Sequence, residues 1–237
     1  MVHGECGLCG LSRLLCDSHL LPRAVYRVLR SSKEPKPDPV FIYDERHGHT
    51  SRQLKIPLLC EKCETRFRTG GEDWVLANYS RADGSFRLRD VLKSVEPIYS
   101  HDDFALYSTD KVQEIDREAL IYFAASIFWR AAVRTWKLLP YSPGIHITLG
   151  PYEKPLRRYL LHEQPFPDNM AIYVRIWSYD NLMALASPPE GHAEQGYHRH
   201  EFHIPGINFS MVVGSRLRPE HYRFSTSHSR EGYIFIL

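Results

Sequence analysis

The sequence has no apolar run long enough to cross a membrane, because no stretch approaches the roughly 18 uninterrupted apolar residues that a spanning helix needs. Its first ten residues, MVHGECGLCG, lack the basic segment and apolar core of a secretory signal peptide. There is no internal repeat and no low-complexity segment. We therefore expect a cytoplasmic protein with no membrane partner. The composition, 43% hydrophobic and 24% charged, is close to a globular average and excludes a disordered tail protein, a collagen-like fibre and a membrane bundle.

The sequence also lacks a large excess of either positive or negative charge. The formal net charge of the 237 residues is +2, which is too small to identify a partner. Residues 1–95 hold 16 Lys and Arg against 12 Asp and Glu, whereas residues 96–237 have two more acidic than basic residues. The length allows one large domain or two small ones. Because the pattern changes near residue 95, we expect domains at 1–95 and 96–237.

Cysteine is rare but informative. The pairs Cys6–Cys9 and Cys60–Cys63 both have the two-residue spacing of a zinc knuckle, and two such pairs complete a tetrahedral site. We predict that these four residues hold a structural Zn²⁺. The alternatives are a disulfide, which a reducing compartment disfavours, and unligated thiols. Cys16 is either a small buried residue or a spare ligand.

Local patterns predict an α+β fold. In the N-terminal part, an apolar stripe predicts a helix at 24–30, and Val40–Tyr43 is a short strand. The second cysteine pair should open a helix that runs through Phe67 and ends at Gly70-Gly71.

The C-terminal part should be a long buried helix packed on a small antiparallel sheet. Residues 111–139 predict that helix, capped by Asp110, because its middle is apolar on nearly every face. A shorter helix is expected at 155–162. Alternating residues predict three strand regions, at 171–177, 201–213 and 232–237.

One order of motifs resembles a known family. The first C-x-x-C is followed by Ser-His-Leu-Leu-Pro at 18–22 and by Leu-Leu-Cys-x-x-Cys-Glu at 58–64. This order resembles the HNH endonuclease family in its four-cysteine zinc version. It looks closer still to bacterial proteins that carry Ser-His-Ile-Ile-Pro and Leu-Leu-Cys-x-x-Cys-Glu. The resemblance covers about residues 5–70 and implies a ββα-metal (treble-clef) fold.

The resemblance also implies a metal-dependent nuclease that hydrolyses phosphodiester bonds of nucleic acid. His19 falls on the family's general-base histidine, and a neutral imidazole can take a proton from the attacking water. Mg²⁺ or Mn²⁺ would stabilise the charge that develops on the phosphate. Ser18 stands where the family has its metal-binding Asp, and Glu64 where it has His. The candidate catalytic ligands near His19 are therefore Asp17, Glu64, Asp44, His47 and His49.

Each candidate also has a structural interpretation. His19 can cap a helix or bond across a hairpin, Glu64 can favour a helix dipole, and His47 and His49 can be exposed loop residues. The alternative function is thus a non-catalytic zinc module that binds nucleic acid or a partner protein. A protein partner would dock on the C-terminal half.

Further basic residues lie in the C-terminal half. Strand alternation places His198 and His200 on one face and His203 on the other, so two histidines can share a metal. Four arginines form either a basic surface for phosphates or solvated helix faces: Arg130, Arg134, Arg157 and Arg158.

Overall fold

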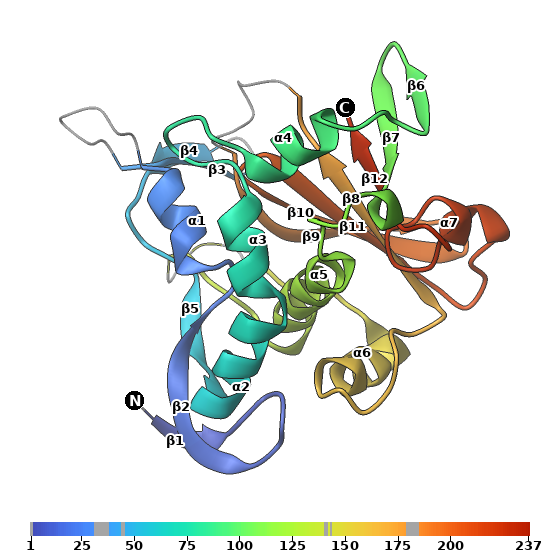
Figure 1. Ribbon diagram of the computed structural model, residues 1–237. Coiled ribbons are helices and arrows are strands. Elements are labelled where there is room, and N and C mark those ends of the chain that lie inside the picture. Colours follow the sequence, from blue (N-terminus) through green and yellow to red (C-terminus); the bar gives the residue numbers. More distant parts are fainter. Residues whose placement is uncertain (1, 31–37, 44–45, 140–141, 143, 179–184) are drawn as a thin grey trace.

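The computed structural model describes residues 2–30, 38–43, 46–139, 142, 144–178 and 185–237; Asp44 lies outside them. The fold is mixed helix and sheet, as predicted. A long helix, α5 (Arg117–Val133), runs across one face of a seven-stranded sheet (Figure 1). Helices of the N-terminal part pack on the other side of α5.

The N-terminal part is built on a three-stranded antiparallel sheet of order β1-β2-β5. Its strands are β1 (Val2–Glu5), β2 (Ser12–His19) and β5 (Lys55–Cys60). Helix α1 (Arg23–Val28) and a separate hairpin of β3 (Val40–Tyr43) and β4 (Arg46–His49) lie between β2 and β5 in sequence. Three helices follow β5: α2 (Glu61–Phe67), α3 (Asp73–Asn78) and α4 (Arg87–Lys93).

The prediction that Gly70-Gly71 ends the helix is wrong. A π-helical turn, Arg68–Glu72, carries the chain directly from α2 into α3. A Cβ atom on Gly71 would lie 2.4 Å from the carbonyl oxygen of Ala119, and one on Gly70 would lie 2.5 Å from the ring of Tyr122. These glycines therefore allow α5 to approach closely instead of ending the helix.

The C-terminal sheet is larger than the small antiparallel sheet expected. Its order is β6-β7-β12-β8-β11-β10-β9, and every pair is antiparallel except β12 with β8. The strands are β6 (Tyr99–His101), β7 (Phe104–Ser108), β8 (Met170–Ile176), β9 (Ser187–Glu194), β10 (Tyr197–Ile204), β11 (Ile207–Val213) and β12 (Tyr233–Ile236). The strands predicted at 171–177, 201–213 and 232–237 are confirmed, whereas β6, β7 and β9 were not predicted.

The long helix is shorter than predicted, and its cap differs. The carboxylate of Asp116 accepts a hydrogen bond from the backbone N–H of Ala119 at 2.8 Å, so Asp116 is the cap. The prediction of Asp110 is wrong because residues 109–111 form a 3₁₀ turn. The backbone N–H of Asp110 donates to the carbonyl of Glu231 beside β12. The helix predicted at 155–162 is confirmed as α6 (Glu153–Leu160).

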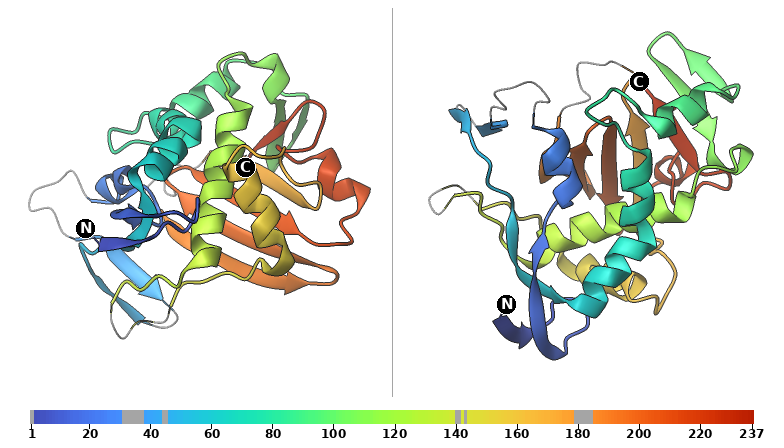
Figure 2. Two further views of the ribbon diagram at one scale, coloured as in Figure 1. Left: turned by 90° about the horizontal axis from the view of Figure 1, so that it is seen from below. Right: turned by 60° about the vertical axis from the view of Figure 1, so that its left-hand side comes forward.

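Helix α5 is buried because it lies between two layers. Phe128 packs on Phe202 of the large sheet, with ring centroids 5.0 Å apart, and Trp129 packs on Phe67 of α2 at 5.9 Å. Seen from below, α5 and α6 lie in front of the sheet (Figure 2). One hydrophobic core thus includes residues of both 1–95 and 96–237. The boundary expected at residue 95 lies between α4 and β6.

Candidate metal centre and neighbouring residues

The four cysteines of the two C-x-x-C pairs converge. Cys6 and Cys9 lie in the turn between β1 and β2, Cys60 ends β5, and Cys63 is in the first turn of α2. All four sulfur atoms lie within 4.8 Å of one another, and Cys9 Sγ is 4.0 Å from Cys60 Sγ. A tetrahedral ion with 2.3 Å metal–sulfur bonds separates its sulfurs by about 3.8 Å. The four residues are therefore positioned to hold a metal ion, as predicted.

Backbone groups support this cluster. The N–H of Cys60 donates to Cys6 Sγ at 3.3 Å, and the N–H of Gly10 donates to the carbonyl of Cys6 at 2.8 Å. Gly10 has φ of +73°, which a glycine adopts without strain. A hydrogen bond from the Cys63 thiol lowers the pKa of Cys6, and nearby backbone N–H groups lower it further. All five cysteines are free, so the four sulfurs are available as thiolate ligands.

His19, at the end of β2, is held by one side chain. Its Nε2 lies 2.8 Å from Oε1 of Gln53, and its ring is half-buried. An amide oxygen only accepts hydrogen bonds, so Nε2 carries the proton in this contact. In the neutral imidazole, Nδ1 then keeps a lone pair. Tyr26 of α1 lies beside the ring, with centroids 6.4 Å apart.

The two residues before His19 point to opposite sides. Ser18 is buried, and its hydroxyl accepts a hydrogen bond from the N–H of Leu59 at 3.1 Å. It is therefore part of the link between β2 and β5. Asp17 is exposed, and its carboxylate lies 3.4 Å from Nζ of Lys55. Asp17 thus offers oxygens on the solvent side of β2.

Cys16, next to Asp17 on β2, lies outside the cysteine cluster. Burial raises the pKa of the Cys16 thiol most, and the charges of Glu64, Glu61 and Asp17 raise it further. Burial and negative charge therefore both oppose deprotonation of this thiol. Cys16 is half-buried, so it is neither the fully buried residue nor the spare ligand that the sequence suggested.

Glu64 is also partly turned inward. Its Oε1 atom is buried and has no hydrogen-bond partner among the residues that the structure describes. Burial raises the pKa of Glu72, the charge of Arg130 lowers it, and the charge of Glu64 raises it. One oxygen of Glu64 is therefore turned inward. Arg130 Nη2 lies 3.6 Å from Glu72 Oε2, in an ion pair whose arginine is buried and whose glutamate is half-buried.

His47 and His49 lie apart on the β3–β4 hairpin. Both are exposed, and strand pairing places them opposite Ile42 and Val40. Nδ1 of His49 is 2.9 Å from the carbonyl oxygen of Asp38. Over the described part of the chain, the four cysteines are the one group of three or more His, Cys, Asp or Glu side chains that could hold a metal. Asp17, His19, Glu64, His47 and His49 do not form a second such group there.

The arginines predicted as a basic surface or as solvated faces divide into two kinds. Arg130 is only 2% exposed and lies over the ring of Phe67 at 4.8 Å, so neither prediction fits it. Nε of Arg157 donates to the carbonyl of Leu8 at 2.6 Å and so ties α6 to the cysteine turn. Arg134 and Arg158 remain exposed or half-exposed. The sequence carried no signal for the contacts of Arg130 and Arg157.

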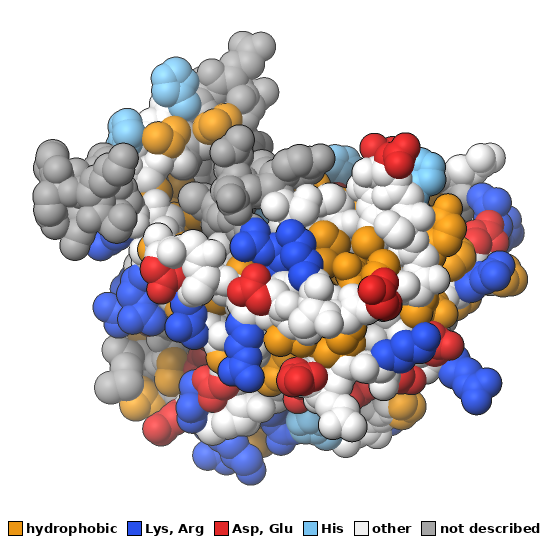
Figure 3. Space-filling view, turned by 45° about the horizontal axis from the view of Figure 1, so that its top comes forward, with side chains coloured by type: hydrophobic (Ala, Val, Ile, Leu, Met, Phe, Trp, Pro, Cys, Tyr) orange, Lys and Arg blue, Asp and Glu red, His pale blue; other side chains and the backbone are white. Residues whose placement is uncertain are grey.

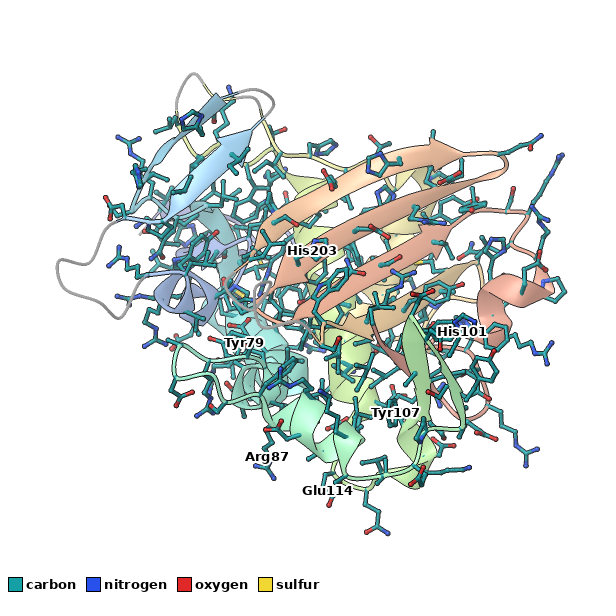
Figure 4. All side chains as sticks on the ribbon, turned by 90° about the horizontal axis from the view of Figure 1, so that it is seen from above. Tyr79, Arg87, His101, Tyr107, Glu114 and His203 are labelled. Carbon is teal, nitrogen blue, oxygen red and sulfur yellow. The ribbon has the colours of Figure 1, made fainter. Side chains whose placement is uncertain are left out.

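The C-terminal histidines lie on two faces of β10, as alternation predicted. His200 faces α5, whereas His203 lies on the other face, seen from above in Figure 4. Arg175 donates to Asn208 Oδ1 at 3.0 Å, so the Asn208 amide N–H donates to His203 Nε2 at 3.0 Å. Nδ1 of His203 must then be the donor to Ser187 Oγ at 2.9 Å. His203 therefore cannot act as a base toward this serine.

None of the described helices has the length and apolar character needed to cross a lipid bilayer. Comparison with protein-family models, with curated proteins and with solved structures finds no match to this chain.

Proposed function

We propose that the four-cysteine cluster holds a structural Zn²⁺. Four soft thiolates at tetrahedral separation are the donor set that this ion prefers. Cys6, Cys60 and Cys63 are each 3% exposed or less, so the site offers no open position for a substrate. Two ligands come from a turn and two from a helix start, which supports the treble clef that the resemblance implies. The test is a zinc content of one ion per chain in the purified protein.

We further propose that the chain is an HNH-like nuclease in which His19 is the general base. The observation that carries this proposal is the 2.8 Å contact between His19 Nε2 and Gln53 Oε1. It holds the ring in the tautomer whose Nδ1 can accept a proton from water. Gln53 is then a positioning residue, because it acts through His19.

Oxygen donors for a second ion lie beside this histidine. Asp17 precedes it by two residues on β2, so strand alternation places both side chains on one face, and Glu64 lies in α2, which packs on β2. These two carboxylates would hold Mg²⁺ or Mn²⁺, which would stabilise charge on the scissile phosphate. His47 and His49 are further ligands only if the β3–β4 hairpin closes toward them.

A basic surface surrounds the same region. Arg23 and Arg27 of α1, together with Arg52 and Lys55 near β5, are all exposed. In Figure 3, Lys and Arg side chains gather on the left, the side on which α1 lies in Figure 1. Such groups bind the phosphates of nucleic acid independently of its sequence.

Two contacts favour the second candidate function, a non-catalytic zinc module that binds nucleic acid or a partner protein. The carboxylate of Asp17 is paired with Lys55, and one oxygen of Glu64 is buried. Both contacts would have to open before the carboxylates could bind a divalent ion.

Incubation of supercoiled plasmid, single-stranded DNA and RNA with Mg²⁺ or Mn²⁺ tests the nuclease. We expect the natural chain to cut one of these substrates, His19→Ala to lose activity at least about 100-fold, and Gln53→Ala to lose part of it. His146→Ala, which changes an exposed histidine elsewhere, is the matched control. Equal cutting by His19→Ala would refute the assignment. Binding without cutting by every variant would support the second candidate.

A further inference from the structure

A solvent-open cavity lies at the end of the large sheet, beside α7 (Pro219–Arg223). Its volume is about 570 Å³, within the roughly 300–1,000 Å³ of small-molecule sites. Six polar or aromatic residues line it: Tyr222, Arg223, His228, Ser229, Arg230 and Tyr233. Figures 1 and 2 place α7 far from the β1–β2 turn, so this cavity is separate from the candidate metal centre.

The charged side chains that line the cavity are basic. Its charged groups are two guanidinium groups, and the lining includes no carboxylate. Arg223 and Arg230 are exposed, and neither has a carboxylate partner among the residues that the structure describes. Asp168, with a fully exposed side chain, lies 3.8 Å from Nε2 of His228. Glu220 and Glu231 are neighbours in sequence of the lining residues Pro219 and Arg230. The guanidinium of Arg223 lies over the ring of Phe224 at 5.2 Å. A guanidinium group can bind phosphate through two parallel hydrogen bonds.

The same cavity also has aromatic walls. Tyr222 and Tyr233 are both half-buried, and the ring of Tyr222 meets His228 edge to face at 5.4 Å. Half-buried tyrosines present ring area against which a planar base can stack. Phosphate-binding and base-stacking groups thus line one cavity.

Hydrogen bonds from Arg117 fix the loop at 226–230, three residues of which line the cavity. Arg117 donates from Nε to the carbonyl of Thr226 at 2.7 Å, and from Nη2 to those of Ser227 and Ser229 at 3.0 and 2.8 Å. The Thr226 hydroxyl donates to the carbonyl of Tyr233 at 2.6 Å. A ligand would therefore not have to order this loop, which lowers the entropic cost of binding.

We propose that this cavity binds a nucleoside monophosphate. The phosphate lies on Arg223 and Arg230, and the base lies against Tyr222 or Tyr233. Either a free nucleotide or the phosphorylated end of a strand supplies this chemistry. The proposal does not rest on the nuclease function, because the two sites share no residue.

Titration calorimetry of the full chain with AMP, without added Mg²⁺, tests the proposal. We expect AMP to bind at least about tenfold more tightly than adenosine or inorganic phosphate, since each of these keeps only half of the contacts. Arg223→Gln and Arg230→Gln should each weaken AMP binding about tenfold. Arg87→Gln, which removes an exposed arginine on α4, should leave it unchanged (Figure 4).

Three results would overturn the proposal: no AMP binding at millimolar concentration, inorganic phosphate binding as tightly as AMP, or affinities that Arg223→Gln and Arg230→Gln leave unchanged. A ten-residue oligonucleotide with a 5′-phosphate is the second arm. If it binds more tightly than AMP and depends on the same arginines, the ligand is a strand end. Because His19→Ala should bind AMP normally, failure of the nuclease and failure of this site are distinguishable.

Discussion

Burial of His200 makes the stability of the protein depend on pH, and His200→Phe should remove part of that dependence. His200 is 2% exposed, and neither of its ring nitrogens has a hydrogen-bond partner in the described part of the chain. Its ring lies against Phe128, with centroids 6.5 Å apart. Burial, followed by the charges of His198 and His192, lowers the pKa of His200 to about 4.

The magnitude follows from the difference between the folded and unfolded states. An unfolded histidine titrates near 6.5, so below that pH the unfolded chain binds a proton that the folded chain does not. The stabilising contribution is complete above pH 6.5 and is lost as the pH falls toward 4. These two pKa values give a loss of about 2 kcal/mol between pH 8 and pH 5, with a limit of about 3 kcal/mol below pH 4.

Urea unfolding between pH 5 and 8, followed by tryptophan fluorescence, measures this contribution. Phenylalanine cannot be protonated and suits a site beside Phe128, so His200→Phe should gain about 2 kcal/mol relative to the natural chain on going from pH 8 to pH 5. Metal loss and the burial-lowered pKa values of His162, His203 and His228 act on both proteins and cancel in the difference. His146→Ala serves as the exposed control. Parallel stability curves for the natural chain and His200→Phe would refute the reasoning.

Three further predictions concern the metal centre and α5. Cys63→Ser should lose the bound metal and most of the thermal stability, whereas Cys16→Ser should keep one ion per chain; metal analysis and thermal melting check both. Gly71→Ala should destabilise the fold by about 2 kcal/mol or more in urea unfolding, because its Cβ would overlap a carbonyl of α5. Arg130→Met should cost about 2 kcal/mol at pH 7, since it leaves the half-buried carboxylate of Glu72 without its partner. Glu72→Gln in the same background should restore part of this loss.

Local patterns in the sequence predicted most of the helices and the later strands. The apolar middle of α5 identified it as a central helix, and alternation identified β8, β10, β11 and β12. The predicted N-terminus of α5 was wrong because two aspartates compete to cap this helix. Asp110 and Asp116 are equally suited to cap a helix, and pairing of residues 109–110 with the chain before β12 selected Asp116. A propensity for capping does not include such long-range bonds.

In the candidate site too, local spacing predicted the ligands, whereas contacts between distant residues were not predicted. Spacing alone identified Cys6, Cys9, Cys60 and Cys63, because two residues between thiols bring both sulfurs to one ion. The resemblance singled out His19, but its contact with Gln53 joins residues 34 apart in sequence. The ion pair of Arg130 and Glu72 joins residues still further apart in sequence, and nothing near either residue indicates its partner.

The amino-acid sequence by itself thus determined the metal ligands, the α+β class and the central helix, because each depends on short spacing or on periodicity within one element. The tertiary structure alone decided that His19 contacts Gln53, that one oxygen of Glu64 is buried and that Arg130 is buried. It also decided that Gly70 and Gly71 let α5 pack closely against the π-helical turn, and that Arg223 and Arg230 line one cavity. These features depend on contacts between distant elements, whose energies arise only when the core brings them together.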